Sequence, residues 1–199
     1  MAAATEPRRY FDARFDATIL TVAPGDHAVT ARPDEVISTV LGSCVAACLR
    51  DPSKGLGGVN HFLLPEAGEG GVDRPDHAMR YGDTAMEILI NSLMRRGADR
   101  SRLEAKIFGG ARVLAGQTLF SIGARNVEFV IKFLKREGIQ IVAKDVEGLR
   151  SRRLYYQPST GKAWVHQLDR PSQTMIVKEE AAYRKKLETQ PRGGSVELF

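Results

Sequence analysis

The sequence has very little cysteine. Its 199 residues include two, Cys44 and Cys48, which lie four positions apart. Two thiols this close cannot build the disulfide framework of a small secreted protein, and a zinc site would need more Cys or His at regular spacing. The sequence therefore predicts a cytoplasmic chain that folds around an ordinary hydrophobic core and has no zinc site.

Long apolar segments are also missing. No window of about 18 consecutive apolar residues occurs, so no segment is predicted to span a membrane. Arg8, Arg9 and Arg14 near the N-terminus are not followed by an apolar core, which argues against a secretory signal. Hydrophobic residues make up 43% of the chain and charged residues 27%, as is typical of a soluble globular domain.

The excess charge is positive, with a formal net charge of +5 at pH 7. Such a chain favours acidic partners in general, of which nucleic acids are one class. The basic residues cluster at Arg95 with Arg96, Arg100 with Arg102, Arg150 with Arg152 and Arg153, and Arg184 with Lys185 and Lys186. No aromatic residues interleave these clusters as base-stacking platforms would, so the sequence does not predict a nucleic-acid-binding protein.

Strand-like and helical segments are mixed along the chain. Apolar residues recur at steps of three and four over residues 83–96, and a second helix is predicted over residues 127–137, before Gly138. Residues 153–157 and 163–167 predict a hairpin around a Pro-Ser-Thr-Gly turn. This pattern predicts a single-domain layered α/β sandwich with a mixed β-sheet and a C-terminal hairpin. The expected organisation is a flexible N-terminal arm (1–17), the folded domain (18–175) and a charged, mobile tail (176–199).

Two glycine-containing turns carry a thiol and an imidazole. Cys44 ends the run LGSC, and His61 ends the run GGVNH. A tight turn can expose a thiol to a carbonyl carbon, and an imidazole nearby can hold that thiol as a reactive thiolate. Backbone N–H groups of the first turn, near Ser43, are candidates for an oxyanion hole. These features indicate a Cys–His nucleophile.

A third group usually orients the base of such a pair. Ser38 and Thr39 are both candidates, because they lie on the strand-like segment that enters the Cys44 turn. Strand alternation allows only one of the two to face Cys44. The plainer interpretation of a lone cysteine is a small buried hydrophobe, and Cys48, in an apolar run without a turn, is expected to be one.

The sequence around both turns matches several motifs of one family. Residues 38–52 read STVLGSCVAACLRDP and residues 57–65 read GGVNHFLLP; further runs are RYG at 80–82, AM at 85–86, KIFGGA at 106–111 and IGARN at 122–126. In these motifs the chain resembles the chemoreceptor glutamine deamidase family, CheD. The resemblance extends from about Val36 to Leu168 and leaves out both ends of the chain.

The resemblance implies hydrolysis of glutamine side-chain amides to glutamate on the cytoplasmic helices of chemotaxis receptors. Transferred by position, Cys44 is the nucleophile and His61 the general base and acid, acting through a thioester and without a cofactor. The family's third catalytic residue is a hydroxyl six positions before the cysteine, here Ser38; Thr39 is the alternative if the register differs by one.

Further residues are candidates for the oxyanion hole or the substrate approach: Ser43, Gly109, Gly110, Arg125 and Asn126. The alternative is that Gly109 and Gly110 are needed for a backbone conformation that other residues rarely adopt, and that Arg125 and Asn126 cap the helix that follows.

Other functions stay open at this point. A different Cys–His hydrolase would share the same chemistry, and a non-catalytic adaptor would bind receptors or a CheC-type phosphatase. The resemblance implies the receptor helices as partners, with a CheC-type phosphatase as a further candidate, and we expect a monomer.

Overall fold

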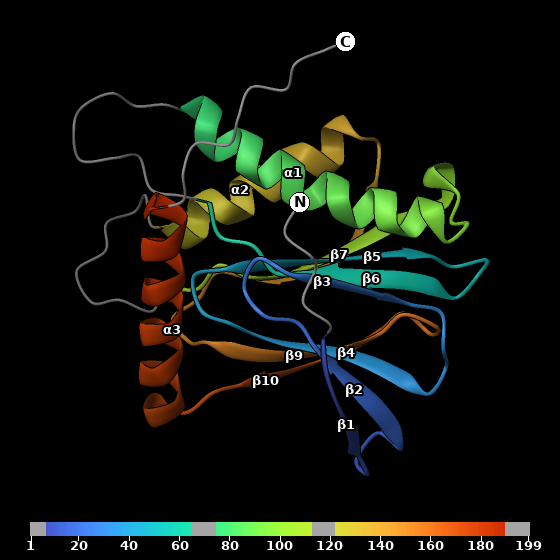
Figure 1. Ribbon diagram of the computed structural model, residues 1–199, viewed down its shortest axis with the longest axis horizontal. Helices are drawn as coiled ribbons and strands as arrows, with labels where there is room; N and C mark the ends of the chain where they lie inside the picture. The colour runs from blue at the N-terminus through green and yellow to red at the C-terminus, as the bar shows by residue number, and fades with distance from the viewer. Residues whose placement is uncertain (1–6, 65–74, 113–121, 190–199) are drawn as a thin grey trace.

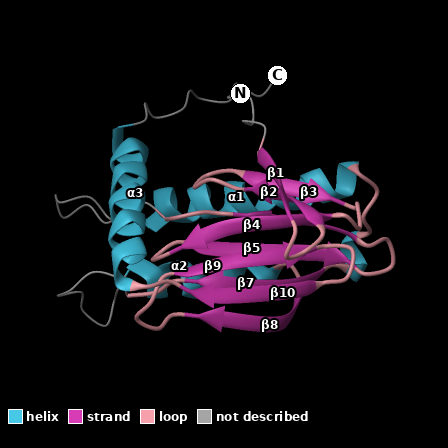
Figure 2. Cartoon of the chain, turned by 90° about the horizontal axis from the view of Figure 1, so that it is seen from below, coloured by secondary structure: helices cyan, strands magenta, loops and turns pink. Residues whose placement is uncertain are grey.

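The computed structural model describes residues 7–64, 75–112 and 122–189. Two five-stranded sheets face each other, and two helices cover the outer face of one sheet (Figure 1). A third helix stands across one end of the two sheets, as Figures 1 and 2 both show. The arrangement confirms the predicted layered α/β sandwich, with two mixed sheets in place of one.

The elements are as follows. The first sheet has the order β1 (Arg8–Asp12), β2 (Ala17–Thr21), β4 (Glu35–Leu41), β9 (Arg152–Gln157) and β10 (Lys162–Gln167). The second has the order β3 (His27–Thr30), β6 (Leu56–Asn60), β5 (Val45–Asp51), β7 (Glu104–Gly109) and β8 (Gln140–Val146). The helices are α1 (Pro75–Arg95), a 3-10 turn (Arg100–Arg102), α2 (Ile122–Arg136) and α3 (Arg170–Thr189). Pairing is parallel for β2 with β4 and for β7 with β8, and antiparallel elsewhere.

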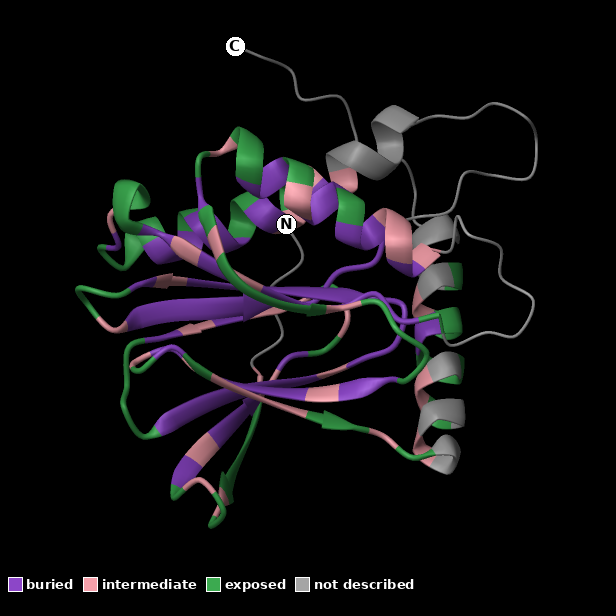
Figure 3. Cartoon of the chain, turned by 180° about the vertical axis from the view of Figure 1, so that it is seen from behind, coloured by how far each residue is buried: buried purple, intermediate pink, exposed green. Residues whose placement is uncertain are grey.

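The core between the sheets follows from strand alternation. On β4, Ile37 and Leu41 point into it, whereas Val36 belongs to a small cluster on the opposite face. On β5, Ala46 and Cys48 point into it. Figure 3 shows that buried residues concentrate where the sheets face each other and beneath the helices. The apolar residues at every second position of each strand therefore determine which face of each sheet packs against the other sheet.

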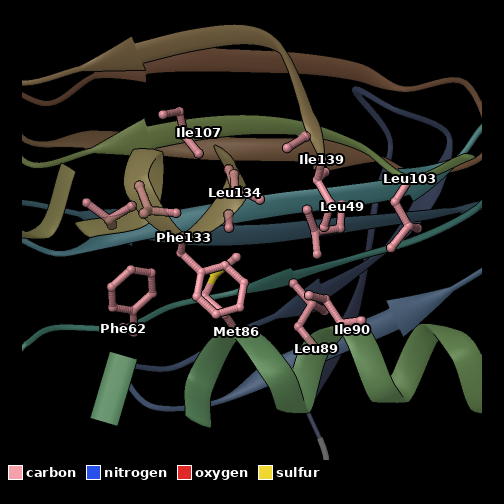
Figure 4. Packing of buried hydrophobic residues seen from close by; sticks show 14 of the residues in the cluster. Leu49, Phe62, Met86, Leu89, Ile90, Leu103, Ile107, Phe133, Leu134 and Ile139 are labelled. Atoms are coloured by element: carbon pink, nitrogen blue, oxygen red, sulfur yellow. The ribbon is translucent and has the colours of Figure 1, made fainter. Parts of the chain in front are cut away.

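The second core lies between the other face of β5 and the two long helices (Figure 4). Met86, Leu89 and Ile90 of α1 pack there against Phe62 and against Phe133 of α2. Both predicted helices are therefore confirmed, although each begins earlier than expected. Each ends before a glycine in the left-handed region, Gly97 at φ +93° and Gly138 at φ +69°.

Regular secondary structure falls within both of the predicted end segments. Within the expected N-terminal arm, β1 pairs antiparallel with β2. Within the expected tail, α3 runs through position 176 to Thr189, while residues 1–6 and 190–199 lie outside the described residues. The C-terminal hairpin is confirmed as β9 and β10. In the described part of the chain, no helix is long and apolar enough to cross a membrane.

Strand β7 ends in a turn that meets the backbone of Cys44. Gly109 has φ +105°, a backbone conformation that residues with a side chain rarely adopt. A Cβ there would lie 2.3 Å from the Cys44 carbonyl oxygen. Gly138 also has a positive φ, but no atom lies within 4 Å of the Cβ it would carry. A side chain at Gly138 would therefore meet backbone strain alone, whereas one at Gly109 would meet both backbone strain and a steric clash.

We predict that Gly109→Ala destabilises the protein by clearly more than Gly138→Ala. The second change adds only left-handed strain, about 1–2 kcal/mol, whereas the first adds a clash with a buried carbonyl. The difference is measured as the free energy of unfolding in urea. Equal losses for the two variants would contradict the close approach of the β7 turn to Cys44.

Candidate active site

Cys44 and His61 come from neighbouring antiparallel strands. Cys44 directly precedes β5 and His61 directly follows β6. The residues next to them, Val45 and Phe62, exchange two backbone hydrogen bonds of 3.0 Å each, which fixes the register of the two turns. In this register Cys44 and His61 are diagonal neighbours on one face, within reach of each other. The structure therefore brings the predicted thiol and imidazole together.

The turn of residues 42–44 directs its carbonyls away from the site. The Gly42 carbonyl accepts from the Ala111 N–H at 2.7 Å, and the Cys44 carbonyl accepts from the Gly110 N–H at 2.7 Å. Between them, the Ser43 carbonyl accepts from Asn126 Nδ2 at 2.8 Å. Because a peptide N–H points opposite to the carbonyl of the preceding residue, binding of the Gly42 and Ser43 carbonyls on one side turns the N–H groups of Ser43 and Cys44 to the other side, where the Gly42 N–H also points.

These three N–H groups converge on one carboxylate, that of Glu180 on α3. Gly42 and Cys44 donate to Oε1 at 2.8 and 3.1 Å. The Ser43 N–H and hydroxyl donate to Oε2 at 2.8 and 2.6 Å. Successive N–H groups that point at one spot form an anion-binding concavity, the geometry of an oxyanion hole. We call residues 42–44 the N–H cradle.

The charge of Glu180 follows from these bonds. Burial raises the pKa of the Glu180 carboxyl, but hydrogen bonds from the Ser43 and Cys44 side chains and backbone outweigh burial. The pKa therefore lies below its usual range, and the carboxylate is ionised at neutral pH. The N–H cradle thus holds a full negative charge.

His61 is oriented by a hydroxyl and a carbonyl. Its Nδ1 lies 2.7 Å from Thr39 Oγ1, which itself donates to the Val22 carbonyl at 2.8 Å. Both hydrogen bonds are made when the Thr39 hydroxyl donates to that carbonyl and its Oγ1 accepts from Nδ1–H, so we assign this tautomer. This assignment leaves Nε2 of His61 as the unprotonated nitrogen, available to take a proton from a thiol.

The orienting hydroxyl is that of Thr39 and not that of Ser38. Thr39 shares its strand face with Ile37 and Leu41, which point between the sheets. Ser38 shares its face with Val36, on the outer side of the sheet, and lies opposite Tyr155 in the pairing with β9. The structure thus brings the alternative candidate, Thr39, to His61, whereas strand alternation turns the Ser38 side chain away from it.

Burial sets the protonation of the imidazole. His61 is 2% exposed, and its Nε2 is buried without a hydrogen bond to any described residue. Burial lowers the pKa of His61, and the nearby Glu180 charge raises it by less. The ring is therefore neutral at neutral pH and can act as a base. By contrast, burial strongly raises the pKa of Cys48, which is the inert core thiol that the sequence predicts.

The other candidate residues support the N–H cradle from behind. Gly109 and Gly110 allow the β7 turn to approach the Cys44 carbonyl. Asn126 is fully buried and bridges the Ser43 carbonyl to the Leu64 N–H. Arg125 is half-buried on α2 and, within the described residues, makes no hydrogen bond to the cradle. Of these candidates, only Ser43 offers polar groups to the site itself.

Glu180 is the site residue that sequence reasoning missed. It lies in a segment predicted to be a mobile tail, and the motifs end before it. Cys44, His61 and Glu180 each place one donor atom within 4.8 Å of the others, a grouping that could also bind a metal ion. However, both carboxylate oxygens of Glu180 already accept hydrogen bonds from the N–H cradle, so an ion would compete with those donors.

Comparison with known proteins identifies the family. The family model described as CheD chemotactic sensory transduction matches residues 63–167. A protein of Rhodopseudomonas palustris named probable chemoreceptor glutamine deamidase CheD is 48% identical, over 96% of this chain and 89% of its own. One of Cupriavidus metallidurans with the same name is 47% identical, over 100% and 92%.

Solved structures offer only remote matches. A crystal structure of a Neisseria meningitidis protein has 12% identity and a TM-score of 0.36, over 62% of this chain and 52% of that one. A score this low does not establish a common fold. The family model and the full-length relatives do agree with each other, and they show that the chain belongs to the CheD family.

Proposed function

We propose that this protein hydrolyses the side-chain amide of selected glutamine residues on chemoreceptors, giving glutamate and ammonia. Three side by side features carry the proposal: the Cys44 thiol, the oriented His61 imidazole and the N–H cradle that faces both. Relatives that are named chemoreceptor glutamine deamidases support the choice of substrate. The proposed substrate is a protein side chain, so the enzyme is an amide hydrolase.

The first half of the reaction is transfer of the acyl group to sulfur. His61 Nε2 takes the Cys44 proton, and the thiolate attacks the glutamine Cδ carbon. The carbonyl oxygen becomes an oxyanion that accepts from the N–H groups of Gly42 and Cys44. The imidazolium then gives its proton to the departing nitrogen, the C–N bond breaks, and ammonia leaves a thioester on Cys44.

Thr39 supports this step by its position. When His61 gains the Cys44 proton, the ring becomes a buried cation whose Nδ1–H still donates to Thr39 Oγ1. Hydrogen bonds to a charged group stabilise it by about 1.5–3 kcal/mol, more than those to a neutral group. The Thr39 hydroxyl therefore favours the state that the reaction needs.

The second half of the reaction hydrolyses the thioester and regenerates the free enzyme. His61 removes a proton from water, and the water oxygen attacks the thioester carbon. The same N–H cradle holds the second oxyanion. The C–S bond breaks, Cys44 regains a proton, and the side chain leaves as glutamate. A carboxylate is the product, and the cradle that binds Glu180 has the donors to hold one.

The partners follow from the substrate. The modified glutamines are proposed to lie on the cytoplasmic helices of the receptors. The enzyme is therefore proposed to act in the cytoplasm. The net charge of +5 suits an encounter with acidic helices. A CheC-type phosphatase partner and a monomeric state stay predictions.

The first test replaces the nucleophile. We predict that Cys44→Ala lowers deamidation of a receptor cytoplasmic domain by at least about 1000-fold. Mass spectrometry of receptor peptides measures the loss, as a mass gain of about 1 Da at glutamine that the variant no longer produces. Cys48→Ala, which removes the other thiol, is the matched control and should remain active. If Cys44→Ala bound the receptor and deamidated it at the wild-type rate, Cys44 would not be the nucleophile.

The second test separates the two neighbouring hydroxyls. We predict that Thr39→Val lowers kcat by about 10- to 100-fold, the loss expected for a hydrogen bond to a charged imidazole. KM should change little, and Thr39→Ser should restore most of the rate because it keeps the oxygen. Ser38→Ala, on the other face of β4, is the control. A larger loss for Ser38→Ala than for Thr39→Val would reverse the assignment.

A further inference from the structure

The face that α3 turns toward the sheets has a charged residue at its centre. Ser172, Ile176 and Tyr183 are half-buried and Glu180 is buried, at steps of four, four and three along the helix. Lys178, Glu179, Ala181 and Ala182 lie on the exposed side. A helix that docked only for stability would place an apolar residue where Glu180 lies. The position of Glu180 therefore calls for a separate explanation.

Helix α3 contacts the Cys44 turn directly and reaches the backbone of His61 through the loop that contains Gly25. Through Glu180 it binds the N–H cradle. Through Tyr183 it reaches the turn that holds His61: a Cβ on Gly25 would lie 2.3 Å from the Tyr183 hydroxyl, and the Gly25 N–H donates to the His61 carbonyl. The Tyr183 hydroxyl also hydrogen-bonds the Tyr81 hydroxyl on α1. With α3 in place, Cys44 is fully buried.

The Glu180 carboxylate does not have the contacts of a catalytic partner of His61. Its two oxygens accept four hydrogen bonds from the N–H cradle and the Ser43 hydroxyl, and the Cys44 side chain also hydrogen-bonds the carboxylate. His61 is instead oriented by Thr39, and its Nε2 makes no hydrogen bond to a described residue. Glu180 therefore fills the space in front of the thiol and does not position the base.

The chemistry of the occupant matches the chemistry of the site. A glutamate side chain is the product of glutamine deamidation, and a helix is the form in which receptor glutamines are presented. Oε1 of Glu180 accepts from the Gly42 and Cys44 N–H groups, where the acyl oxygen of a substrate would lie during attack. An ionised carboxylate beside the sulfur also opposes a second negative charge there.

We propose that α3 is an intramolecular occupant of the substrate-binding site, with Glu180 in the place of a reacted substrate side chain. This inference rests on the proposed deamidase function. A substrate helix binds only after α3 leaves, and it then takes the same course across the end of the sheets. Its glutamine enters the N–H cradle, and the residue three positions later lies near Tyr81.

The occupancy is tested by the reactivity of the thiol in the full chain. Glu180→Ala removes the bonds to the cradle, whereas Glu179→Ala removes a neighbouring charge on the exposed side of the same helix. We expect Cys44 in Glu180→Ala to react with iodoacetamide at least about tenfold faster than in the wild type, because the site opens more often. Glu179→Ala should match the wild type, and the buried Cys48 is an internal reference in the same digest. An unchanged rate for Glu180→Ala would overturn the proposal.

A second variant tests whether residue 180 lies where a substrate reacts. Glu180→Gln places an amide in the cradle. The Cys44 sulfur would bond to Cδ as the C–N bond breaks and ammonia leaves, and water would then replace sulfur to give glutamate. We expect residue 180 to gain about 1 Da with time, at a rate independent of protein concentration and abolished by Cys44→Ala. Glu179→Gln should keep its glutamine. Glutamine that persists at 180, with Cys44 as protected from iodoacetamide as in the wild type, would overturn the proposal.

Receptor deamidation separates this inference from the proposed function. If Glu180→Ala raises deamidation of a receptor cytoplasmic domain together with thiol reactivity, both stand. If the wild type and Glu180→Ala deamidate the receptor equally and their Cys44 thiols react equally, the occupancy fails and the function stands. If neither chain deamidates the receptor while thiol reactivity rises tenfold, the function fails and α3 still covers the site.

Discussion

The site depends on how three successive peptide groups are held. The carbonyls of residues 42–44 are each bound from behind, by the N–H groups of Ala111 and Gly110 and the side-chain amide of Asn126. Because a peptide N–H points opposite to the carbonyl of the preceding residue, binding of the Gly42 and Ser43 carbonyls aims the Ser43 and Cys44 N–H groups at one spot beside the Cys44 sulfur, where the Gly42 N–H also points. The donors need no reorganisation when charge develops on a substrate oxygen, which is the main contribution that a protein can make to acyl transfer. Two glycines in left-handed conformations make the clamp possible.

Backbone contacts also position His61, the proposed base. The bridge between Val45 and Phe62 fixes the register of the two strands, so that Cys44 and His61 lie on the face between the sheets. The opposite sheet supplies Thr39 and the Val22 carbonyl, which set the His61 tautomer. The proposed nucleophile and base thus come from one sheet and the groups that orient the base from the other. The packing of the two sheets is therefore part of the catalytic geometry.

The sequence predicts the parts of this arrangement that depend on local pattern. The apolar spacing of α1 and α2, the turn before the hairpin and the Cys44 and His61 motifs are all readable from short segments. The choice between Ser38 and Thr39 needs the parity of β4, which is known only once Ile37 and Leu41 are seen to face the second sheet. Gly110 and Asn126 bind backbone carbonyls of the Cys44 turn, which is more than 60 residues away in the sequence, so no local pattern predicts these contacts. Helix α3 was missed because Glu180, at the centre of its buried face, breaks the apolar pattern and carries the charge typical of a solvated tail.

The proposed reaction proceeds through a covalent acyl intermediate on Cys44, whose oxygen lies in the N–H cradle. Receptor deamidation in the presence of hydroxylamine, followed by mass spectrometry of the modified residues, tests for this intermediate. A thioester on Cys44 partitions between water and this nucleophile, so we expect glutamyl hydroxamate at the same positions as glutamate, in a proportion that rises with hydroxylamine concentration. Glutamate alone at every concentration, formed at an unchanged rate, would contradict it and would indicate direct attack by water.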